Sequence, residues 1–299
     1  VVLKDIVDSM SDKVCVGPYK LDKMEPNLTI PEDVSITQDQ VASYDLMDGV
    51  EATDELSGIK STTKSGEIGT LVKSYQITYT SIDQAGNSIS KTRNIIVTKS
   101  DLPIISLTPL NTNGGYTKAQ NVVLTVNDNS GLKSVTYQIT KDGVEQAEQT
   151  VSINGTHAET TIPLNTNGTY TIKVIAIDQY DNETLLTSGE YKIDIDKPTV
   201  ALNVQGSPFN SDGWAKSNFN IEVTTSDTGG SNVKSYKYCK GTSNNCTPST
   251  SVSSTTGTIA ITTESSTNYV CAVSIDNAGN ESDKACVGPY KLDKTITVP

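Results

Sequence analysis

A phrase of thirteen residues near the start of the chain, SDKVCVGPYKLDK at positions 11–23, returns near its end as SDKACVGPYKLDK at positions 282–294. The two copies differ at one position, Val14 against Ala285. Self-similarity at a fixed spacing is the sequence signature of a repeat array, in which one structural unit follows another. Since both copies lie where one unit stops and the next begins, the phrase predicts a chain of tandem units and argues against one large core.

A second pattern closes each unit. It reads YQITYTSIDQAGN at 75–87, YTIKVIAIDQYDN at 170–182 and NYVCAVSIDNAGN at 268–280. The alternation of apolar and polar residues predicts a half-buried strand, and the Ile-Asp step followed by a turn ending in Asn predicts a tight connection to another strand. We therefore expect a β-hairpin at the end of every unit.

A strand, an Asp-containing turn and another strand recur earlier in the units, at 115–139 and at 213–239, with a diverged version at 50–59. These repeats divide the chain into a C-terminal remnant of a preceding repeat, three full units, and the start of a next repeat or linker, at 1–24, 25–100, 101–196, 197–294 and 295–299. Units of this length with about seven short strands and no helical periodicity are typical of immunoglobulin-like sandwiches. The predicted fold class is all-β, with tandem immunoglobulin-like β-sandwiches.

Composition agrees with this fold class. Hydrophobic residues make up 35% of the 299 residues, and the aromatic residues are 13 Tyr, 2 Phe and 1 Trp. Cores must therefore be thin and built from Val, Ile, Leu and Tyr, which suits two-layer sandwiches. The net charge of −12 disfavours nucleic acid as a partner. No stretch approaches the roughly 18 apolar residues of a membrane span, so none is expected in this segment.

These motifs carry a family resemblance that covers most of the chain. The first unit, with YDLMDGVEATD at 44–54 and the segment 75–97, resembles the bacterial Ig-like domains often called Big group 3. The second and third units resemble Ig-like repeats from large surface proteins of Gram-positive bacteria, although the second has QYDN at 179–182 where Ala-Gly-Asn is usual. The resemblance implies an extracellular, cell-surface spacer, stalk or adhesin segment; a phage virion decoration protein is an alternative context.

A ligand-binding module is the alternative from another functional class. Its loops at one end of a sandwich would bind a host or cell-surface protein or a glycan. The loops here are rich in Ser, Thr, Asn and Gly and poor in the Trp and Arg that anchor interfaces. This composition favours the spacer.

Catalytic motifs are missing from the sequence. The single histidine, His157, lies in the polar segment NGTHAET without a nucleophile motif near it, and there is no phosphate-binding glycine loop. Carboxylate pairs for glycoside chemistry need a cleft lined by aromatic residues, and Trp214 alone is thin support. We expect that the chain is not an enzyme.

The five cysteines are Cys15, Cys239, Cys246, Cys271 and Cys286. Cys15 is the repeat counterpart of Cys286, and the partner that this offset implies falls just before Val1, so Cys15 is expected to be unpaired by truncation. We favour a Cys271–Cys286 disulfide, since the two cysteines flank the predicted hairpin turn evenly, and Cys239–Cys246 across a short polar loop. A Cys239–Cys271 bridge between neighbouring strands stays open, with both side chains expected on the outward face of the sheet.

A zinc site would need four converging thiolates, and spacings of C-x6-C and C-x14-C within strands fit it poorly. Disulfides imply an oxidising compartment, which agrees with an exported protein.

Aspartates of the linkers, first turns and closing hairpins should gather at the end of each sandwich where the chain enters. Three such sets exist: Asp22, Asp54 and Asp83; Asp101, Asp128 and Asp178; Asp196, Asp227 and Asp276. Three carboxylates and nearby carbonyls can supply the six to eight oxygens that calcium takes. The competing interpretation is that each Asp caps its own turn through backbone N–H groups. Calcium is the only cofactor that the sequence suggests.

Overall fold

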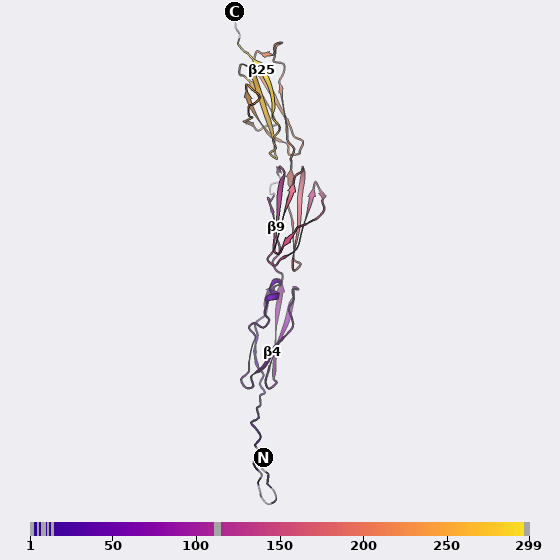
Figure 1. The fold of residues 1–299 in the computed structure, drawn as a ribbon, viewed down its shortest axis with the longest axis vertical. Coiled ribbons are helices and arrows are strands. Elements are labelled where there is room, and N and C mark those ends of the chain that lie inside the picture. Colours follow the sequence, from indigo (N-terminus) through magenta and orange to yellow (C-terminus); the bar gives the residue numbers. More distant parts are fainter. Residues whose placement is uncertain are drawn as a thin grey trace. The chain divides into compact units, whose positions relative to one another are not determined.

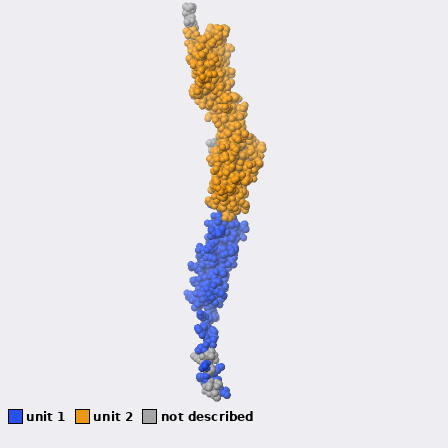
Figure 2. Space-filling model, in the orientation of Figure 1, with its two compact units in different colours: residues 1–101 blue, residues 102–299 orange. Residues whose placement is uncertain are grey.

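The computed structural model describes residues 3–4, 6, 10, 12, 15–110 and 115–295, and the regular secondary structure of these residues is almost entirely β-strand (Figure 1). The chain divides into two compact units, residues 1–101 and 102–299 (Figure 2). Paired, mainly antiparallel sheets around separate apolar cores confirm the predicted class of tandem immunoglobulin-like β-sandwiches. In the described part of the chain, no helix has the length and apolar character needed to cross a membrane.

The first unit contains one sandwich. One sheet has the strand order β2 (Val34–Thr37), β6 (Ser88–Thr98), β5 (Ser74–Asp83) and β4 (Ile59–Ser65). The other pairs β1 (Asn27–Thr29) with β3 (Glu51–Thr53). Alternate residues of β5 and β6, such as Ile77, Tyr79 and Ile95, point into the core and are fully buried. A short 3-10 helix, η1 (Gln38–Ser43), follows β2; the sequence patterns did not indicate it.

The second unit begins with a sandwich whose sheets meet over a core of Val, Ile, Leu and Tyr. One sheet is β13 (Ile153–Asn154), β14 (His157–Leu164), β9 (Gln120–Asn127) and β7 (Ile104–Thr108). The other is β11 (Val144–Glu145), β10 (Leu132–Lys141), β15 (Gly168–Asp178), β17 (Tyr191–Ile193) and β8 (Tyr116–Thr117), with β12 (Gln149–Thr150) on β10 and β16 (Glu183–Thr187) on β15.

The same unit ends with a further sandwich, here called the third. The smaller sheet has the strand order β18 (Thr199–Val204), β20 (Phe219–Ser226) and β23 (Thr256–Ile261). The larger sheet has the order β19 (Trp214–Ala215), β25 (Ala285–Leu292), β24 (Ser265–Asp276), β21 (Val233–Gly241) and β22 (Thr250–Val252). Phe209, Phe219 and Tyr290 pack ring to ring at one end of its core, with centroids 5.2 to 5.7 Å apart.

The closing turn has one geometry in all three sandwiches. The amide of the turn's Asp donates to the carbonyl of its Asn over 3.1, 3.0 and 3.2 Å in chain order. The residue before that Asn needs a positive φ, which Gly86 and Gly279 adopt at 98° and 89°. Asp181 takes the same place at 65°, because Asp tolerates the left-handed region better than most residues. The QYDN variant therefore makes the same turn.

The two copies of the thirteen-residue phrase are in different environments. In the C-terminal copy, residues 285–292 form β25, and Leu292 is 1% exposed. In the N-terminal copy, the described residues 15–23 form no strand, and Tyr19 and Leu21 are 79% and 76% exposed.

Candidate metal centres and the cysteine cluster

Asp22, Asp54 and Asp83 come together in the first unit, where one carboxylate oxygen from each lies within 4.8 Å of the others. Asp22 belongs to the segment before β1, Asp54 follows β3, and Asp83 ends β5. The sandwich therefore places the linker, the first turn and the closing hairpin at one end, and all three aspartates of the first predicted set meet there. We call these three residues the first acidic cluster.

Asp83 is a buried anion. Its side chain is 0% exposed, its Oδ1 accepts hydrogen bonds from the amides of Gly86 and Asn87 at 2.6 and 2.8 Å, and its Oδ2 accepts one from Asn87 Nδ2 at 2.8 Å. Burial raises the pKa of Asp83, but the hydrogen bonds from Asn87, Gly86 and Ala85 outweigh it and hold the pKa below its ordinary value of 3.8.

Asp54 caps its own turn as well as joining the cluster. Its Oδ1 accepts hydrogen bonds from the amides of Leu56, Ser57 and Gly58 at 3.2, 2.7 and 2.8 Å. The bond from Gly58 contributes most to keeping the pKa of Asp54 below 3.8. The capping interpretation and the cluster interpretation therefore both apply to this residue.

Asp22 is left partly unsatisfied. Its Oδ1 accepts a hydrogen bond from the Met24 amide at 2.9 Å, whereas its Oδ2 is buried and has no hydrogen-bond partner. Within the described part of the chain, none of the ion pairs includes a carboxylate of this cluster. A buried, unpaired oxygen beside two further anions is costly unless a cation compensates it.

The third sandwich carries a matching arrangement, the second acidic cluster, formed by Asp194, Asp227 and Asp276 within the same 4.8 Å. Asp276 repeats the Asp83 pattern, accepting from the Asn280 amide at 2.7 Å and from its side chain at 2.8 Å. Asp194 is 0% exposed, and its Oδ1 and Oδ2 each accept a backbone hydrogen bond at 3.0 Å, from Asp196 and Ser231. In this cluster the linker carboxylate is fully paired.

The sequence prediction named Asp196 as the linker member of that set, and the structure corrects it to Asp194. Asp196 Oδ2 instead accepts a hydrogen bond from Asn167 Nδ2 at 2.8 Å. The sequence held the needed signal, since YKID at 191–194 matches YKLD at 19–22 and places Asp194 in the position of Asp22.

The remaining predicted set does not form an acidic triad among the described residues. Ser130 Oγ connects two of its members, donating to Asp128 Oδ1 at 2.5 Å and lying 3.4 Å from Asp178 Oδ2. Asp128 Oδ2 is buried without a hydrogen-bond partner. Asp101 is the last residue of the first compact unit and is exposed.

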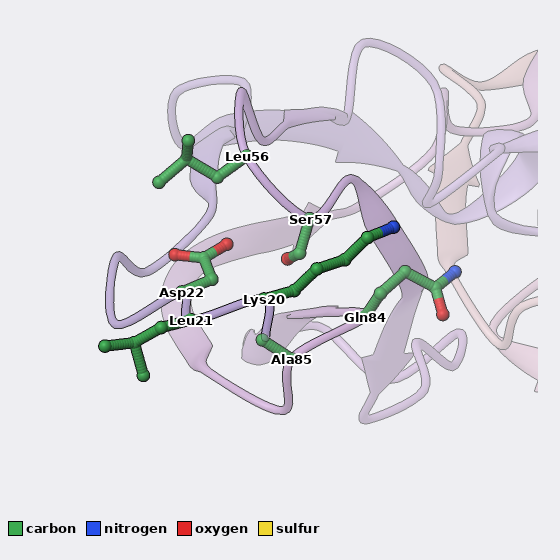
Figure 3. A pocket seen from close by; sticks show the side chains of 7 residues that line it. All are labelled: Lys20, Leu21, Asp22, Leu56, Ser57, Gln84 and Ala85. Atoms are coloured by element: carbon green, nitrogen blue, oxygen red, sulfur yellow. The ribbon is translucent and has the colours of Figure 1, made fainter. Parts of the chain in front are cut away.

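A groove of about 700 Å³ lies beside Asp22 (Figure 3). It is lined by Lys20, Leu21, Asp22, Leu56, Ser57, Gln84 and Ala85. Its one hydroxyl, that of Ser57, donates a hydrogen bond to Asp54 Oδ1 over 3.3 Å, and no histidine is among the lining residues. His157, at the start of β14, pairs with Asn127 Oδ1 through its Nδ1 at 2.8 Å.

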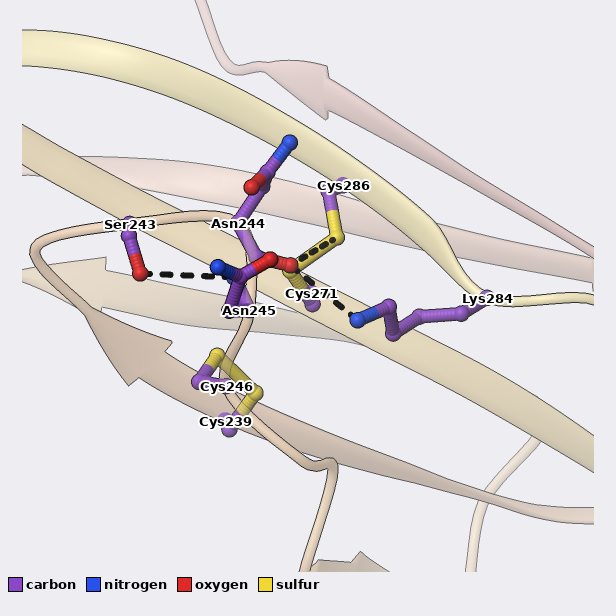
Figure 4. The surroundings of a disulfide bond; sticks show 8 residues. All are labelled: Cys239, Ser243, Asn244, Asn245, Cys246, Cys271, Lys284 and Cys286. Atoms are coloured by element: carbon purple, nitrogen blue, oxygen red, sulfur yellow. Dashed lines mark hydrogen bonds between the residues drawn. A yellow bond between two sulfur atoms is a disulfide. The ribbon is translucent and has the colours of Figure 1, made fainter.

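Disulfides join Cys239 to Cys246 and Cys271 to Cys286, whereas Cys15 is free and exposed (Figure 4). Cys271 and Cys286 are direct cross-strand partners on β24 and β25, and so are Cys239 and Cys271 on β21 and β24. Sulfurs held in disulfides cannot act as the thiolates that zinc requires.

The sequence expected Cys239 and Cys271 on the outward face of the sheet, and the structure buries both, with 8% and 0% exposed. Val270 and Ala272, their alternating neighbours, point into the core, so the cysteines do lie on the other face. The loop that ends in Cys246 approaches this face, with Asn244 O 3.5 Å from Cys271 Sγ. The alternation of side chains along the strands predicted the face of the sheet correctly. It could not predict that the loop ending in Cys246 covers that face.

No protein-family model and no curated protein matches the chain. Solved structures do match. The fibronectin(III)-like modules of CbhA from Clostridium thermocellum are 13% identical, with a TM-score of 0.37, over 66% of this chain and 98% of that one. A Ca2+-stabilised adhesin with which an Antarctic bacterium binds ice is 15% identical, with a TM-score of 0.33, over 88% and 72%. Titin domains A168–A170 are 12% identical, with a TM-score of 0.41, over 82% and 91%.

Proposed function

We propose that the chain is a non-catalytic spacer or adhesin segment of an extracellular bacterial surface protein with Big-type repeats, and that its acidic clusters bind calcium. The observation that carries the proposal is the first acidic cluster, in which Asp22, Asp54 and Asp83 converge around a buried oxygen with no partner. Such a cluster has a structural use in a chain of sandwiches, because it lies where a linker meets the turns of the next sandwich.

The charges of the first cluster favour a cation. Hydrogen bonds hold the pKa of Asp54 and of Asp83 below 3.8, so both are anionic at neutral pH. Unit charges about 4 Å apart repel by roughly 4 kcal/mol at an effective dielectric constant of 20. Divalent calcium converts that repulsion into attraction, and it accepts oxygen ligands in flexible geometry.

The extracellular location is supported by the two disulfides, which persist in oxidising compartments. Calcium sites of extracellular modules bind in the range of about 10⁻⁴–10⁻³ M, which suits a cluster built from turns and lacking a dense calcium loop. In this proposal the metal fixes the linker onto the sandwich that follows it, and the linker loses freedom that it has without metal.

Calcium titration of the chelator-treated chain tests the proposal. Differential scanning calorimetry should show a rising Tm with calcium, because a ligand at 100 times its Kd adds about 2.7 kcal/mol of stability per site. Isothermal titration should show binding in the same concentration range, with magnesium as the comparison ion. No change in Tm and no binding heat at calcium concentrations up to about 100 times the upper end of this Kd range would refute the metal sites.

Variants separate the cluster from general charge effects. Asp54→Asn and Asp22→Asn should each weaken the calcium response of the first unit. Asp33→Asn is the matched control, because Asp33 is also hydrogen-bonded, to Asn94, and lies outside both clusters. An equal response in the control and the cluster variants would contradict the assignment. Antibody labelling of intact cells that carry the full gene tests the surface role separately, since it does not depend on calcium.

A further inference from the structure

Four cysteines form one cluster on the larger sheet of the third sandwich, drawn in Figure 4. The sulfurs of Cys239, Cys246 and Cys271 lie within 4.8 Å of one another. Cys271 faces Cys239 on one neighbouring strand and Cys286 on the other. It therefore has two cross-strand partners within reach, and the observed disulfide uses only one of them.

We propose that this cluster is a thiol–disulfide exchange site. A small thiol of the glutathione class attacks the Cys239–Cys246 disulfide. Cys271 then exchanges its disulfide partner from Cys286 to Cys239. The product holds a Cys239–Cys271 disulfide and a free thiol at Cys286.

The solvent exposure of Cys239 and Cys246 decides which of the two sulfurs the incoming thiol attacks. Cys246 is partly exposed and follows an exposed loop, residues 242–245, whereas Cys239 is buried. An incoming thiolate therefore reaches Cys246 Sγ more readily and forms a mixed disulfide with it. The electron pair of the broken bond leaves on Cys239, which is the sulfur that faces Cys271.

The second step is an exchange within the sheet. The Cys239 thiolate bonds to Cys271 Sγ, the Cys271–Cys286 bond breaks, and the electron pair leaves on Cys286, which takes a proton from solvent. One disulfide replaces another, so this step needs no oxidant. Lys284 lies next to the departing sulfur: its Nζ is 3.0 Å from Asn244 O, and that oxygen is 3.5 Å from Cys286 Sγ. A nearby ammonium group stabilises a departing thiolate.

The exchange changes the last strand of the sandwich. In the observed pairing, β25 is bonded covalently to β24 through Cys271–Cys286. After the exchange, β25 is held by hydrogen bonds and packing alone, and the thiol at Cys286 is available to a thiol-bearing partner. The cluster thereby couples the redox state of an exposed loop to the anchoring of a core strand.

A variant that starts from the intermediate tests this inference directly. Cys246→Ser, made in a Cys15→Ser background to remove the exposed thiol, leaves Cys239 without its partner. After incubation at pH 8, acid quenching, alkylation and non-reducing digestion, mass spectrometry should find Cys239 linked to Cys271 and the alkylated thiol at Cys286. Alkylation confined to Cys239, with Cys271–Cys286 intact, would overturn the proposal.

Two further measurements guard against a folding artefact. The matched control is Cys239→Ser with Cys246→Ser in the same background, which keeps only Cys271–Cys286 and should show no free thiol at Cys286. In the unaltered chain, a time course with glutathione should show the Cys239–Cys271 peptide before full reduction. If Cys239–Cys246 is reduced while Cys271–Cys286 stays intact, the two disulfides are independent and the inference fails.

Discussion

The first and third sandwiches carry the same acidic cluster at equivalent turns, but they satisfy the linker carboxylate differently. Asp194 has a backbone N–H on each oxygen, whereas Asp22 has one on Oδ1 and none on Oδ2. The second cluster is thus closer to a closed hydrogen-bond network, and the first has a buried carboxylate oxygen without a hydrogen-bond partner. The comparison teaches that one motif can leave its linker carboxylate fully or only partly hydrogen-bonded, depending on how many amides the following loop supplies.

The sandwiches also differ in covalent support, and reduction should expose that difference with the largest effect. Loop-closure entropy assigns about 3 kcal/mol to Cys271–Cys286 and about 2 kcal/mol to Cys239–Cys246, whose sequence separations are 15 and 7. Calorimetry with and without dithiothreitol should show the transition of the third sandwich falling by tens of degrees. The transition of the first sandwich should stay in place, and an equal fall in both would contradict this account.

Replacing the linker aspartate by asparagine should affect the stability of the two sandwiches in opposite ways. One should lose stability without calcium, and the other should lose part of its response to calcium. In calcium-free buffer, Asp194→Asn should destabilise its sandwich by about 1–3 kcal/mol, because it weakens two charge-assisted hydrogen bonds. Asp22→Asn should cost little without calcium, since it removes repulsion, but it should weaken the gain that calcium gives to the first unit. Urea unfolding of both variants, with and without calcium, measures this. Equal losses without metal would show that Asp22 is as well satisfied as Asp194.

Two glycines test how tightly the turns are built. A Cβ on Gly229 would overlap Asp194 Oδ1, so Gly229→Ala should cost about 1–3 kcal/mol by forcing the second cluster apart. Gly86 has φ of 98° and open space around it, so Gly86→Ala should cost only about 1 kcal/mol of backbone strain. Thermal unfolding of the two variants compares them. A larger loss at Gly86 would show that backbone strain outweighs the overlap at Gly229.

Acid should lower the stability of the first unit over a defined pH range. The pKa of Asp54 and of Asp83 lies below 3.8 in the folded state, so their stabilising contribution is fully present above about pH 4. It is lost as the pH falls through the lower, folded values, because protonation breaks the carboxylate hydrogen bonds. Unfolding of the chelator-treated chain between pH 5 and 2 should follow this course, and Asp54→Asn should flatten it. A loss of stability that begins above pH 5 would point to other groups.

Much of this architecture could be predicted from local sequence, because strand alternation and turn chemistry act over a few residues. The Asp83 turn, the meeting of Asp22 with Asp54, and the favoured cysteine pairs follow from such patterns. The choice of Asp194 over Asp196 was also within reach of the sequence, because YKID at 191–194 aligns with YKLD at 19–22. The unpaired Oδ2 of Asp22 depends on which amides a loop presents, and no pattern in the sequence encodes that.

The Cys271–Cys286 bond has a consequence for a chain that is pulled from its ends. Tension applied beyond Leu292 peels β25 from β24 only as far as Cys286, and the residues between the two cysteines stay outside the line of force. At roughly 3.5 Å per extended residue, 15 residues withhold about 50 Å of contour, and Cys239–Cys246 withholds about 25 Å more. An unfolded third sandwich is therefore a shorter tether than its residue count implies, whereas the first sandwich, with no cysteine in any of its strands, yields its whole length.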